Sequence, residues 1–347
     1  MTKIISVGII GFGRMGITHF SIINSHPNVE IKAVADSSST ILGLLKKYVK
    51  EINTYKNYKE LFETELIDAV LICTPPSFHY PIAIEAAQKN IHVFIEKPCT
   101  INKESALELS ELFEEKHLVN QVGYVNRYND VFQTVKRFID NRVIGQLIRF
   151  KSEMYSCTIT KSAEGKSWRD SHVSGGGATF DMAAHAIDLV NYLVGKPDKV
   201  IGSSLTKIFS RNVEDAVSAT FLYANGITGT LNVNWSDSSF RKPTNKIELF
   251  GSDGKILADQ HGIKVFKNSP SISFNMISGW NTIYITDVFK SVPFYVRGNE
   301  FTSQLYQFVD SILDREKSNI CTIRNSAETL EVIEEIFSDY QSSGKNI

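Results

Sequence analysis

The sequence predicts an α/β protein in which an N-terminal doubly wound parallel sheet is followed by an α+β domain with a mainly antiparallel open sheet. Its 347 residues exceed the length at which a single hydrophobic core usually stops growing, which favours two domains. Short apolar runs first alternate with helical patterns, and later runs alternate apolar and polar residues one by one. We place the domains at residues 1–124 and 125–347, with the C-terminal helices free to pack back toward the first domain.

The N-terminal domain contains five predicted strands that are short, apolar and rich in β-branched residues. They are expected at Ile4–Ile10, Glu30–Ala35, Ala69–Cys73, His92–Ile95 and Asn120–Tyr124. Helical patterns separate them, at Met15–Asn24, Ser39–Tyr48, Tyr58–Glu63, Tyr80–Lys89 and Lys103–Glu115. Buried strands joined by helical crossovers run parallel, so these elements predict a doubly wound sheet.

The C-terminal domain shows its clearest strand at 227–236, where apolar residues and glycine alternate with polar ones. Further strands are expected at Gln146–Tyr155, Lys199–Thr206, Ala216–Tyr223 and Asn245–Phe250. Helical patterns at Glu300–Asp314 and Ser326–Ser342 close the chain. The stretch 263–299 is rich in Ser, Asn and aromatic residues, and we predict no helix or strand in it. It could cover a cleft or an interface.

The charge balance excludes some classes of partner. Lys and Arg number 37 and Asp and Glu 38, which gives a net charge of −1, and no long run of either sign occurs. A nucleic-acid or anionic-membrane partner would require a concentrated basic surface, so we expect neither. The expected partner is a small polar substrate.

Cysteine usage and the absence of long apolar stretches indicate a cytoplasmic protein. The four cysteines are scattered without metal-ligand spacing, so we expect a reducing compartment and no bound metal. The N-terminal apolar run is soon interrupted by Gly8 and Gly11, unlike a signal peptide. No run of 18 apolar residues that could span a membrane is present.

A glycine-rich motif follows the first predicted strand and opens the first predicted helix. Its residues are Gly11, Phe12, Gly13, Arg14, Met15 and Gly16. The first glycine permits a tight turn, the second lets the backbone approach a pyrophosphate, and the third lets helix and strand pack closely. The helix N-terminus then offers N–H groups to the phosphates. The strand–motif–helix order predicts a dinucleotide-binding Rossmann domain; the alternative is a turn that binds no nucleotide.

An acidic residue at the end of the second strand predicts which dinucleotide binds. Asp36 stands 20 positions after Gly16, where a carboxylate can accept hydrogen bonds from the adenosine ribose. It would repel a 2′-phosphate, and Ser37 rather than an arginine follows it. We therefore expect NAD, with NADP disfavoured.

The loops after the third and fourth strands are expected to border the nicotinamide half of the site, because ligands of such sheets lie beyond the carboxyl ends of the strands. Thr74 and Pro75 belong to the first of these loops, and His79 follows as a residue beside the cofactor or merely at a helix start. Glu96 ends the fourth strand, where it could contact the nicotinamide ribose or neutralise Lys97.

Several segments together resemble the Gfo/Idh/MocA oxidoreductase family. They are the Gly11–Gly16 motif, the run 90–98 that ends in Glu96-Lys97-Pro98, the segment 122–128, the glycine-rich run 175–188 and the Gly251-Ser252-Asp253-Gly254 turn. The resemblance covers nearly the whole chain in order. It implies a Rossmann domain, a C-terminal domain with an open antiparallel sheet, and a homodimer or homotetramer packed through that sheet.

The resemblance also implies a catalytic trio, which maps onto Lys97, Asp181 and His185. The chain departs from the family at Ala183, where a glycine is common; alanine is small and a better helix former, so little consequence is expected. Asp181 and His185 are four positions apart and would share one face of a helix.

The residue types of the trio suit the oxidation of a secondary alcohol. Imidazole exchanges protons near neutral pH, so His185 is the expected general base. Lys97 would hydrogen-bond the reacting oxygen and stabilise its developing negative charge. Asp181 would orient the substrate or Lys97. The sequence leaves open whether Lys97 or His185 takes the proton.

Four further residues are expected to bind substrate. Trp168 and Arg169 precede the glycine-rich run and form an amphipathic pair that could reach over the ligand or lie in an incidental surface loop. Tyr124 and Arg127 stand at the domain junction, where they could line the cleft or merely pack the hinge.

Together these residues predict an NAD-dependent dehydrogenase that acts on a sugar, a nucleotide sugar or a cyclitol. The polar substrate follows from the family resemblance alone. One alternative is a redox-neutral lyase or glycosidase of the same family, in which NAD is recycled during each turnover. Another is an NAD-binding regulator without catalysis, which would have no chemical need for the trio.

Overall fold

The computed structural model describes residues 3–161, 168–317 and 319–344, and the chain forms two compact units. The first unit spans Met1–Val125 and Ser291–Ala327, and the second spans Asn126–Lys290 and Glu328–Ile347. The sequence analysis divided the chain at residue 124 and left the C-terminal helices free to pack toward the first domain. Residues 291–327 lie with the N-terminal residues, because the helix they contain completes the first core.

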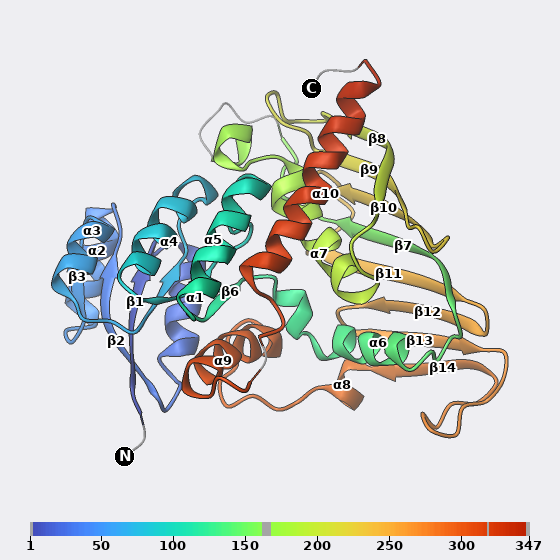
Figure 1. The fold of residues 1–347 in the computed structure, drawn as a ribbon, viewed down its shortest axis with the longest axis horizontal. Coiled ribbons are helices and arrows are strands. Elements are labelled where there is room, and N and C mark those ends of the chain that lie inside the picture. The colour runs from blue at the N-terminus through green and yellow to red at the C-terminus, as the bar shows by residue number, and fades with distance from the viewer. Residues whose placement is uncertain (1–2, 162–167, 318, 345–347) are drawn as a thin grey trace. The chain divides into compact units, whose positions relative to one another are not determined.

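The first unit is built on a parallel sheet of six strands in the order β3-β2-β1-β4-β5-β6 (Figure 1). The strands are β1 (Ile5–Ile10), β2 (Val29–Ala35), β3 (Asn53–Tyr55), β4 (Ala69–Ile72), β5 (His92–Ile95) and β6 (Asn120–Val122). The order reverses between β1 and β4, which makes the sheet doubly wound, as predicted. The sequence analysis missed β3, whose three residues are too few to establish a period.

Helices connect these strands at α1 (Arg14–Ile23), α2 (Ser39–Tyr48), α3 (Tyr58–Thr64), α4 (His79–Gln88) and α5 (Lys103–Glu115). Three of them begin where a polar side chain accepts a hydrogen bond from the first turn. Ser38 caps α2, Asn57 caps α3 and Asn102 caps α5. The α1 helix has no such cap, because Gly13 occupies its N-cap position.

Helix α9 (Asn299–Leu313) belongs to the first unit, although most of the sequence separates it from α1, which ends at Ile23. It packs against α1, and its inner face enters the same hydrophobic core as β1 and β5. Phe308 is fully buried there and meets the Phe94 ring edge-on at a centroid distance of 6.0 Å. The apolar face of α9 is therefore buried within the core of the first unit.

The second unit is built on an eight-stranded sheet in the order β14-β13-β12-β11-β7-β10-β9-β8. The strands are β7 (Leu147–Tyr155), β8 (Lys199–Thr206), β9 (Ala216–Leu222), β10 (Thr228–Asn234), β11 (Thr244–Gly251), β12 (Gly254–Asp259), β13 (Gly262–Lys267) and β14 (Gly279–Tyr284). Only the β7–β10 pair is parallel among these described strands, so the sheet is mainly antiparallel, as predicted.

The strands β13 and β14 occupy part of the stretch 263–299 to which the sequence analysis assigned no element. Every residue of the edge strand β14 is partly or fully exposed, so the strand has no buried face that a period-2 apolar pattern could reveal. The analysis also missed helix α6 (Asp130–Asp140) and the short α8 (Ile285–Val288). The helix α10 (Ile323–Ser342) was predicted, with its start three residues late.

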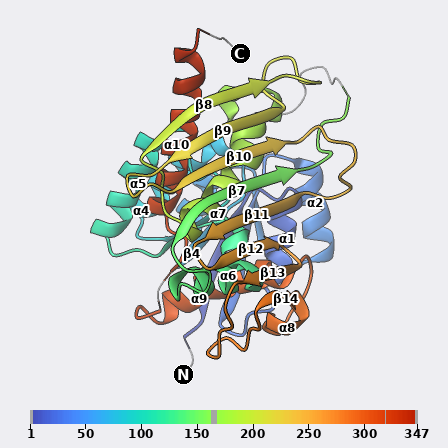
Figure 2. The ribbon, with the colours of Figure 1, turned by 90° about the vertical axis from the view of Figure 1, so that its right-hand side faces the viewer.

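Helices cover one face of this sheet. Helix α6 packs against β12 and β13, and α7 (Ala184–Leu193) packs against β7 and β10. Figure 2 looks onto the opposite face of the strands. There Lys151 lies opposite Glu248 and Glu153 lies opposite Lys246, so acidic and basic side chains alternate across the central strands.

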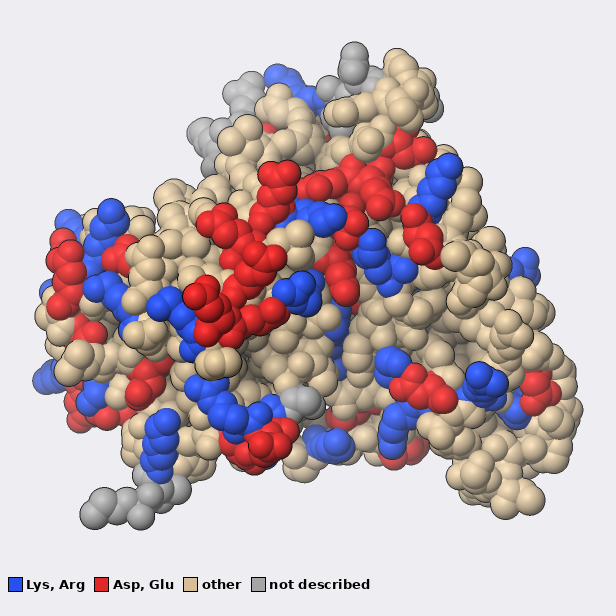
Figure 3. Space-filling view, in the orientation of Figure 1, with Lys and Arg blue, Asp and Glu red and all other residues tan. Residues whose placement is uncertain are grey.

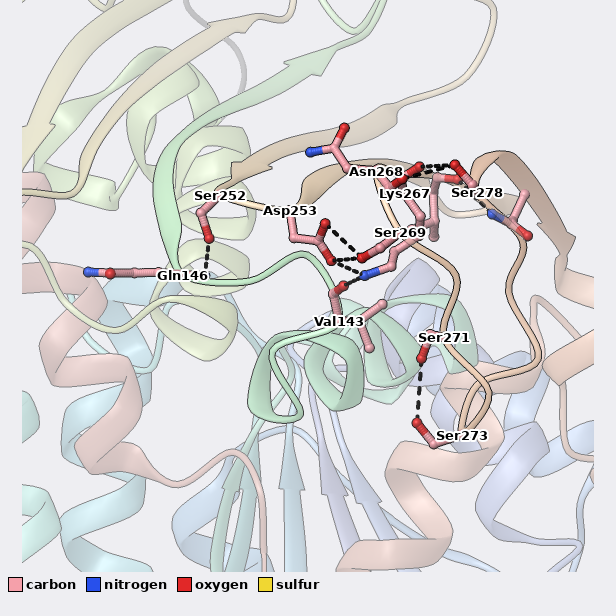
Figure 4. Close-up of polar contacts among 12 residues, drawn as sticks. Val143, Gln146, Ser252, Asp253, Lys267, Asn268, Ser269, Ser271, Ser273 and Ser278 are labelled. Atoms are coloured by element: carbon pink, nitrogen blue, oxygen red, sulfur yellow. Dashed lines mark hydrogen bonds and ion pairs between the residues drawn. The ribbon is translucent and has the colours of Figure 1, made fainter.

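A polar cluster fixes the turn between β11 and β12, within the family-like Gly-Ser-Asp-Gly sequence (Figure 4). The Lys267 amino group donates to an Asp253 carboxylate oxygen at 2.6 Å and to the Val143 carbonyl. Ser269 donates to the same carboxylate, and the Ser252 hydroxyl accepts from the backbone N–H of Gln146. The cluster ties three segments together and satisfies a lysine that is almost completely buried.

Charged side chains of both signs share the face shown in Figure 3. Acidic residues gather along α10, which contains Glu331, Glu334 and Asp339, and no broad basic area appears on this face. In the described part of the chain, no helix combines the length and the hydropathy that crossing a bilayer requires.

Candidate functional site

The glycine-rich loop after β1 has two positions at which only glycine fits. Gly11 has φ +87°, and an added Cβ would lie 2.7 Å from the Cys73 carbonyl carbon. An added Cβ on Gly16 would lie 2.1 Å from the Gly11 carbonyl oxygen. Both contacts are far shorter than van der Waals distance, so the loop requires glycine for its turn and for the approach of α1 to β1.

Gly13 is different, because an added Cβ would meet no atom within 4 Å. Its backbone is extended with φ −72°, so a steric turn requirement does not explain the glycine. The position stands at the N-cap of α1, where no side chain makes a capping hydrogen bond to the first turn. This open space at a helix N-terminus fits a bound pyrophosphate. Next to it Arg14 is exposed, Met15 is half-buried and Phe12 enters the core.

Asp36 binds the glycine-rich loop to the end of β2. One carboxylate oxygen accepts from the Phe12 backbone N–H at 2.6 Å, and the other accepts from the Ser38 N–H at 2.8 Å. The carboxylate is half-buried, and the neighbouring Ser37 is exposed. The acidic group therefore lies at the glycine loop, where the ribose of a dinucleotide would be expected.

Thr74 and Pro75 follow β4 and are half-buried, whereas His79 is fully buried. The two ring nitrogens of His79 each face a backbone carbonyl: Nε2 lies 2.8 Å from the Thr74 oxygen and Nδ1 lies 2.9 Å from the Pro98 oxygen. Burial lowers the pKa of His79 below its usual value, although the two carbonyl acceptors act in the opposite direction. His79 thus links the loop after β4 to the segment that contains Lys97.

Glu96 pairs with a residue that the sequence analysis did not single out. Its Oε1 lies 2.5 Å from Nε2 of His19, which is fully buried on α1. The inward position of His19 could have been found from its spacing, since Gly16, His19 and Ile23 share the buried face of α1. Its partner could not, because Glu96 is 77 positions away.

In the second unit, Asp181 and His185 lie at the junction of a π-helical turn (Thr179–Ala183) and α7. The sequence analysis expected one α-helix here, so the first turn is wider than predicted. Its start is bound to Glu214, whose carbonyl accepts from the Ala178 N–H and whose carboxylate accepts from the Thr179 N–H at 2.8 Å. Such wide turns occur frequently at functional sites.

Asp181 and His185 are distinguished by exposure. Between Gly175 and Asn191 all residues are buried except Asp181 and His185, which are partly exposed. Two polar residues that remain partly accessible in an otherwise buried segment are candidates for binding a ligand.

Arg169 binds Asp181 directly. Its Nε donates to a carboxylate oxygen at 2.8 Å, and its guanidinium lies 4.6 Å from the centre of the Trp168 ring. Trp168, Arg169 and Asp181 therefore form one group, in which the aromatic ring and the carboxylate together orient the arginine.

Arg127 and Tyr124 lie in the interior. Arg127 is 3% exposed and donates through Nε and Nη2 to the fully buried Asp188, at distances from 2.8 to 3.1 Å. Its guanidinium also faces the Tyr192 ring at 5.4 Å. Tyr124 is fully buried in the first unit.

The structure thus brings the predicted residues together in two groups. In the first unit the glycine loop, Asp36, Thr74, Pro75, Glu96 and Lys97 follow the carboxyl ends of β1, β2, β4 and β5. In the second unit Trp168, Arg169, Asp181 and His185 surround the start of α7. The first group defines a dinucleotide-binding oxidoreductase fold.

Comparison with known proteins gives the family. Residues 5–124 match the family described as "Oxidoreductase family, NAD-binding Rossmann fold", and residues 132–257 match the "GFO/IDH/MocA C-terminal domain". The chain belongs to the Gfo/Idh/MocA oxidoreductase family. This confirms the predicted family and the predicted NAD-binding fold.

Relatives of the chain include two inositol dehydrogenases. It is 27% identical over 285 residues to scyllo-inositol 2-dehydrogenase (NAD(+)) of Bacillus subtilis, covering 79% of this chain and 80% of that protein. It is 26% identical over 261 residues to myo-inositol 2-dehydrogenase of Thermotoga maritima, covering 73% of this chain and 75% of that protein. Levoglucosan dehydrogenase in complex with NADH and levoglucosan has the same fold, with a TM-score of 0.87 at 20% identity over 98% of both chains.

Proposed function

We propose that the protein is an NAD-dependent dehydrogenase that transfers a hydride between nicotinamide and a secondary hydroxyl of a sugar, nucleotide sugar or cyclitol. The observation that carries the proposal is the pair Asp181 and His185, which remain accessible in an otherwise buried segment. A protein that only bound NAD would have no need to keep both of them accessible. The inositol and levoglucosan dehydrogenases among its relatives support a polyhydroxylated substrate.

The open space at Gly13 and the carboxylate of Asp36 fit the pyrophosphate and the adenosine ribose of NAD. The acidic charge of Asp36 disfavours the 2′-phosphate of NADP. Residues of the motif, together with Ser37, Thr74, Pro75 and Glu96, would complete the cofactor site. When bound, NAD supplies the hydride acceptor.

In the proposed oxidation, the substrate carbon loses a hydride to nicotinamide and its hydroxyl loses a proton, which leaves a ketone. His185 takes the proton, and Lys97 donates a hydrogen bond to the oxygen as its negative charge develops. Asp181 orients the substrate and is itself held by Arg169. Trp168 and Arg169 are proposed to bind substrate.

Arg127 and Tyr124 were expected to bind substrate, but their burial favours a supporting role. The ion pair between Arg127 and Asp188 satisfies a charge that would otherwise be costly to bury. We propose that it holds the start of the second unit against α7.

The proposal is tested by incubating the protein with NAD and a panel of inositols, free sugars and nucleotide sugars while NADH absorbance is followed. We expect one class to produce NADH, and Lys97→Ala and His185→Ala each to lower kcat by about 100-fold or more. The matched control is Lys89→Ala, an exposed lysine of the same unit. NADH formation that survives Lys97→Ala unchanged would contradict the assigned role of Lys97.

The redox-neutral alternative predicts a different result from the same panel. Substrate would be consumed, as seen by chromatography, with only catalytic amounts of NAD and no net NADH. If NAD bound tightly but no substrate were consumed, the regulatory alternative would be favoured.

The family resemblance further predicts a homodimer or homotetramer in the cytoplasm, packed through the open face of the second sheet. Alternating charges on β7 and β11 could pair with those of a second copy. Light scattering during size-exclusion chromatography should give twice or four times the chain mass, and the double variant K151E/K246E should reduce it. A monomeric wild type would contradict this prediction.

A further inference from the structure

The residues on both sides of Lys97 are each bound by a fully buried histidine. His19 reaches Glu96, which precedes the lysine, and His79 reaches Pro98, which follows it. All of these residues belong to the first unit. The two histidines come from α1 and from the start of α4, so two helices hold one short segment after β5.

His19 is held between the Phe94 ring and the Glu96 carboxylate. Its ring meets the Phe94 ring edge-on at 5.1 Å, and Nε2 lies 2.5 Å from Glu96 Oε1. The other Glu96 oxygen accepts from the Lys97 backbone N–H at 3.3 Å. A Cβ added to Gly123 would lie only 3.2 Å from that oxygen, so the carboxylate fits closely between α1 and the backbone of 123.

The contacts of His79 connect two backbone segments. Thr74 and Pro98 each present a carbonyl oxygen to one ring nitrogen. A neutral imidazole has a single N–H and can donate to one of them, whereas the imidazolium donates to both. The buried ring therefore joins the loop after β4 to the residue after Lys97.

We infer that His19 and His79 are positioning residues, which fix the backbone of Lys97 through Glu96 and Pro98. This inference rests on the proposed function, in which the Lys97 amino group meets the reacting oxygen. A lysine side chain has several rotatable bonds, so its amino group can be placed only from a fixed backbone. A displacement of about 1 Å at a reacting group can cost about 100-fold in rate.

Two pairs of substitutions separate positioning from simple packing. Glutamine places its amide nitrogen near the position of Nε2, so His19→Gln retains a donor toward Glu96 and His19→Leu removes it. Asparagine mimics Nδ1, so His79→Asn places an amide N–H toward the Pro98 carbonyl, and His79→Gln places one toward the Thr74 carbonyl instead. The matched control is His26→Leu, which replaces a buried histidine of the same unit that contacts Asp310 instead.

The first measurement is hydrogen–deuterium exchange of the peptide that contains residues 95–101, which requires no substrate. We expect exchange to rise about tenfold in His19→Leu and His79→Gln, and to stay near the wild-type rate in His26→Leu. Equal exchange in all variants would overturn the inference, whatever the reaction proves to be.

The second measurement is kcat and KM with the substrate found in the panel. We expect kcat to fall about 100-fold in His19→Leu while the NADH dissociation constant changes less than about threefold, and His19→Gln to restore most of kcat. We expect His79→Asn to be faster than His79→Gln. Unchanged kcat in His19→Leu and His79→Gln, with Lys97→Ala inactive, would overturn the positioning role but leave the proposed function intact. If Lys97→Ala is fully active, the proposed function fails at Lys97 and the positioning role falls with it.

Discussion

At the scale of single residues, the Asp215 carboxylate is held by hydrogen bonds from several donors. It is fully buried and accepts from the backbone N–H groups of Ile208, Phe209 and Ser210 and from the Ser210 hydroxyl. The indole of Trp235 donates to it at 2.5 Å. Burial alone would raise the pKa of Asp215, but these hydrogen bonds outweigh burial and hold its pKa below the usual value.

We therefore predict that Asp215→Asn lowers the free energy of unfolding at neutral pH by about 3 kcal/mol, because an amide group cannot accept all of these hydrogen bonds. The folded-state pKa lies below the unfolded value of about 3.9. The contribution of the charge is thus complete above about pH 5 and is lost as the pH falls through the folded-state pKa. Urea unfolding at several pH values measures both effects.

The control for this prediction is Asp237→Asn, which replaces an aspartate of the same unit bonded only locally to Ser239. It should leave the unfolding midpoint almost unchanged. If Asp215→Asn lost no more stability than this control, the buried hydrogen bonds would not have the importance assigned to them.

Asp36 is the residue that should set the choice between NAD and NADP. We predict that Asp36→Asn reduces the preference for NADH over NADPH by about 10- to 100-fold, because it removes the negative charge while keeping an oxygen that can accept from Phe12. Fluorescence titration with the two reduced cofactors measures the ratio of dissociation constants. The control is Asp68→Asn, whose carboxylate binds the Ser6 N–H at the opposite end of the strands. An equal ratio in both variants would contradict the role of Asp36.

At the scale of the element, α1 combines a phosphate-binding end with a positioning residue. Its N-terminus is left open by Gly13, and His19, nearly two turns later, contacts Glu96. The same short helix can therefore hold a pyrophosphate and the segment next to Lys97.

We predict that Gly13→Ala leaves stability nearly unchanged and weakens NADH binding by about tenfold or more. The new methyl group meets no protein atom within 4 Å, but it enters the space proposed for the pyrophosphate. Gly43→Ala in α2, which also meets nothing within 4 Å, is the control and should bind NADH normally. Calorimetric titration and thermal unfolding give the two quantities. Normal NADH binding by Gly13→Ala would place the pyrophosphate elsewhere.

In the turn that precedes α7, the structure differs from what the local sequence predicts. The spacing of Asp181 and His185 predicts a common helical face, and the two are indeed the accessible positions of the segment. The first turn is π-helical, and the backbone and side chain of Glu214 both accept hydrogen bonds from its start. Glu214 is more than 30 residues away in the sequence, so no local pattern could indicate the wider turn.

At the scale of the whole molecule, the first unit is assembled from two separate stretches of the sequence, Met1–Val125 and Ser291–Ala327. Residues 291–327 return to it after the second sheet, and the inner face of α9 completes its core. NAD binding by the first unit should therefore depend on residues that lie far from the motif in sequence.

We predict that Phe308→Ala lowers the free energy of unfolding by about 3–5 kcal/mol, because it leaves a cavity against Phe94. NADH binding should then be lost at a lower temperature than in the wild type. Thermal unfolding by circular dichroism, with and without NADH, measures this. Phe289→Ala, which removes a ring that is 44% exposed, is the control. Equal midpoints in the two variants would show that α9 is not part of the core.

The sequence by itself determined the features that depend on neighbouring residues. Periodicity predicted most strands and helices, and the Gly11–Gly16 motif with Asp36 predicted the NAD-binding fold, because each such signal lies within one β-α-β unit. The segments around Lys97 and His185 indicated the family in the same way.

Only the tertiary structure decided which side chains meet. The pairs His19–Glu96, His79–Pro98 and Arg169–Asp181 join different elements, and so does the packing of α9 on α1. Local sequence carries no record of such contacts, because folding buries distant segments against one another according to the whole apolar surface that must leave water.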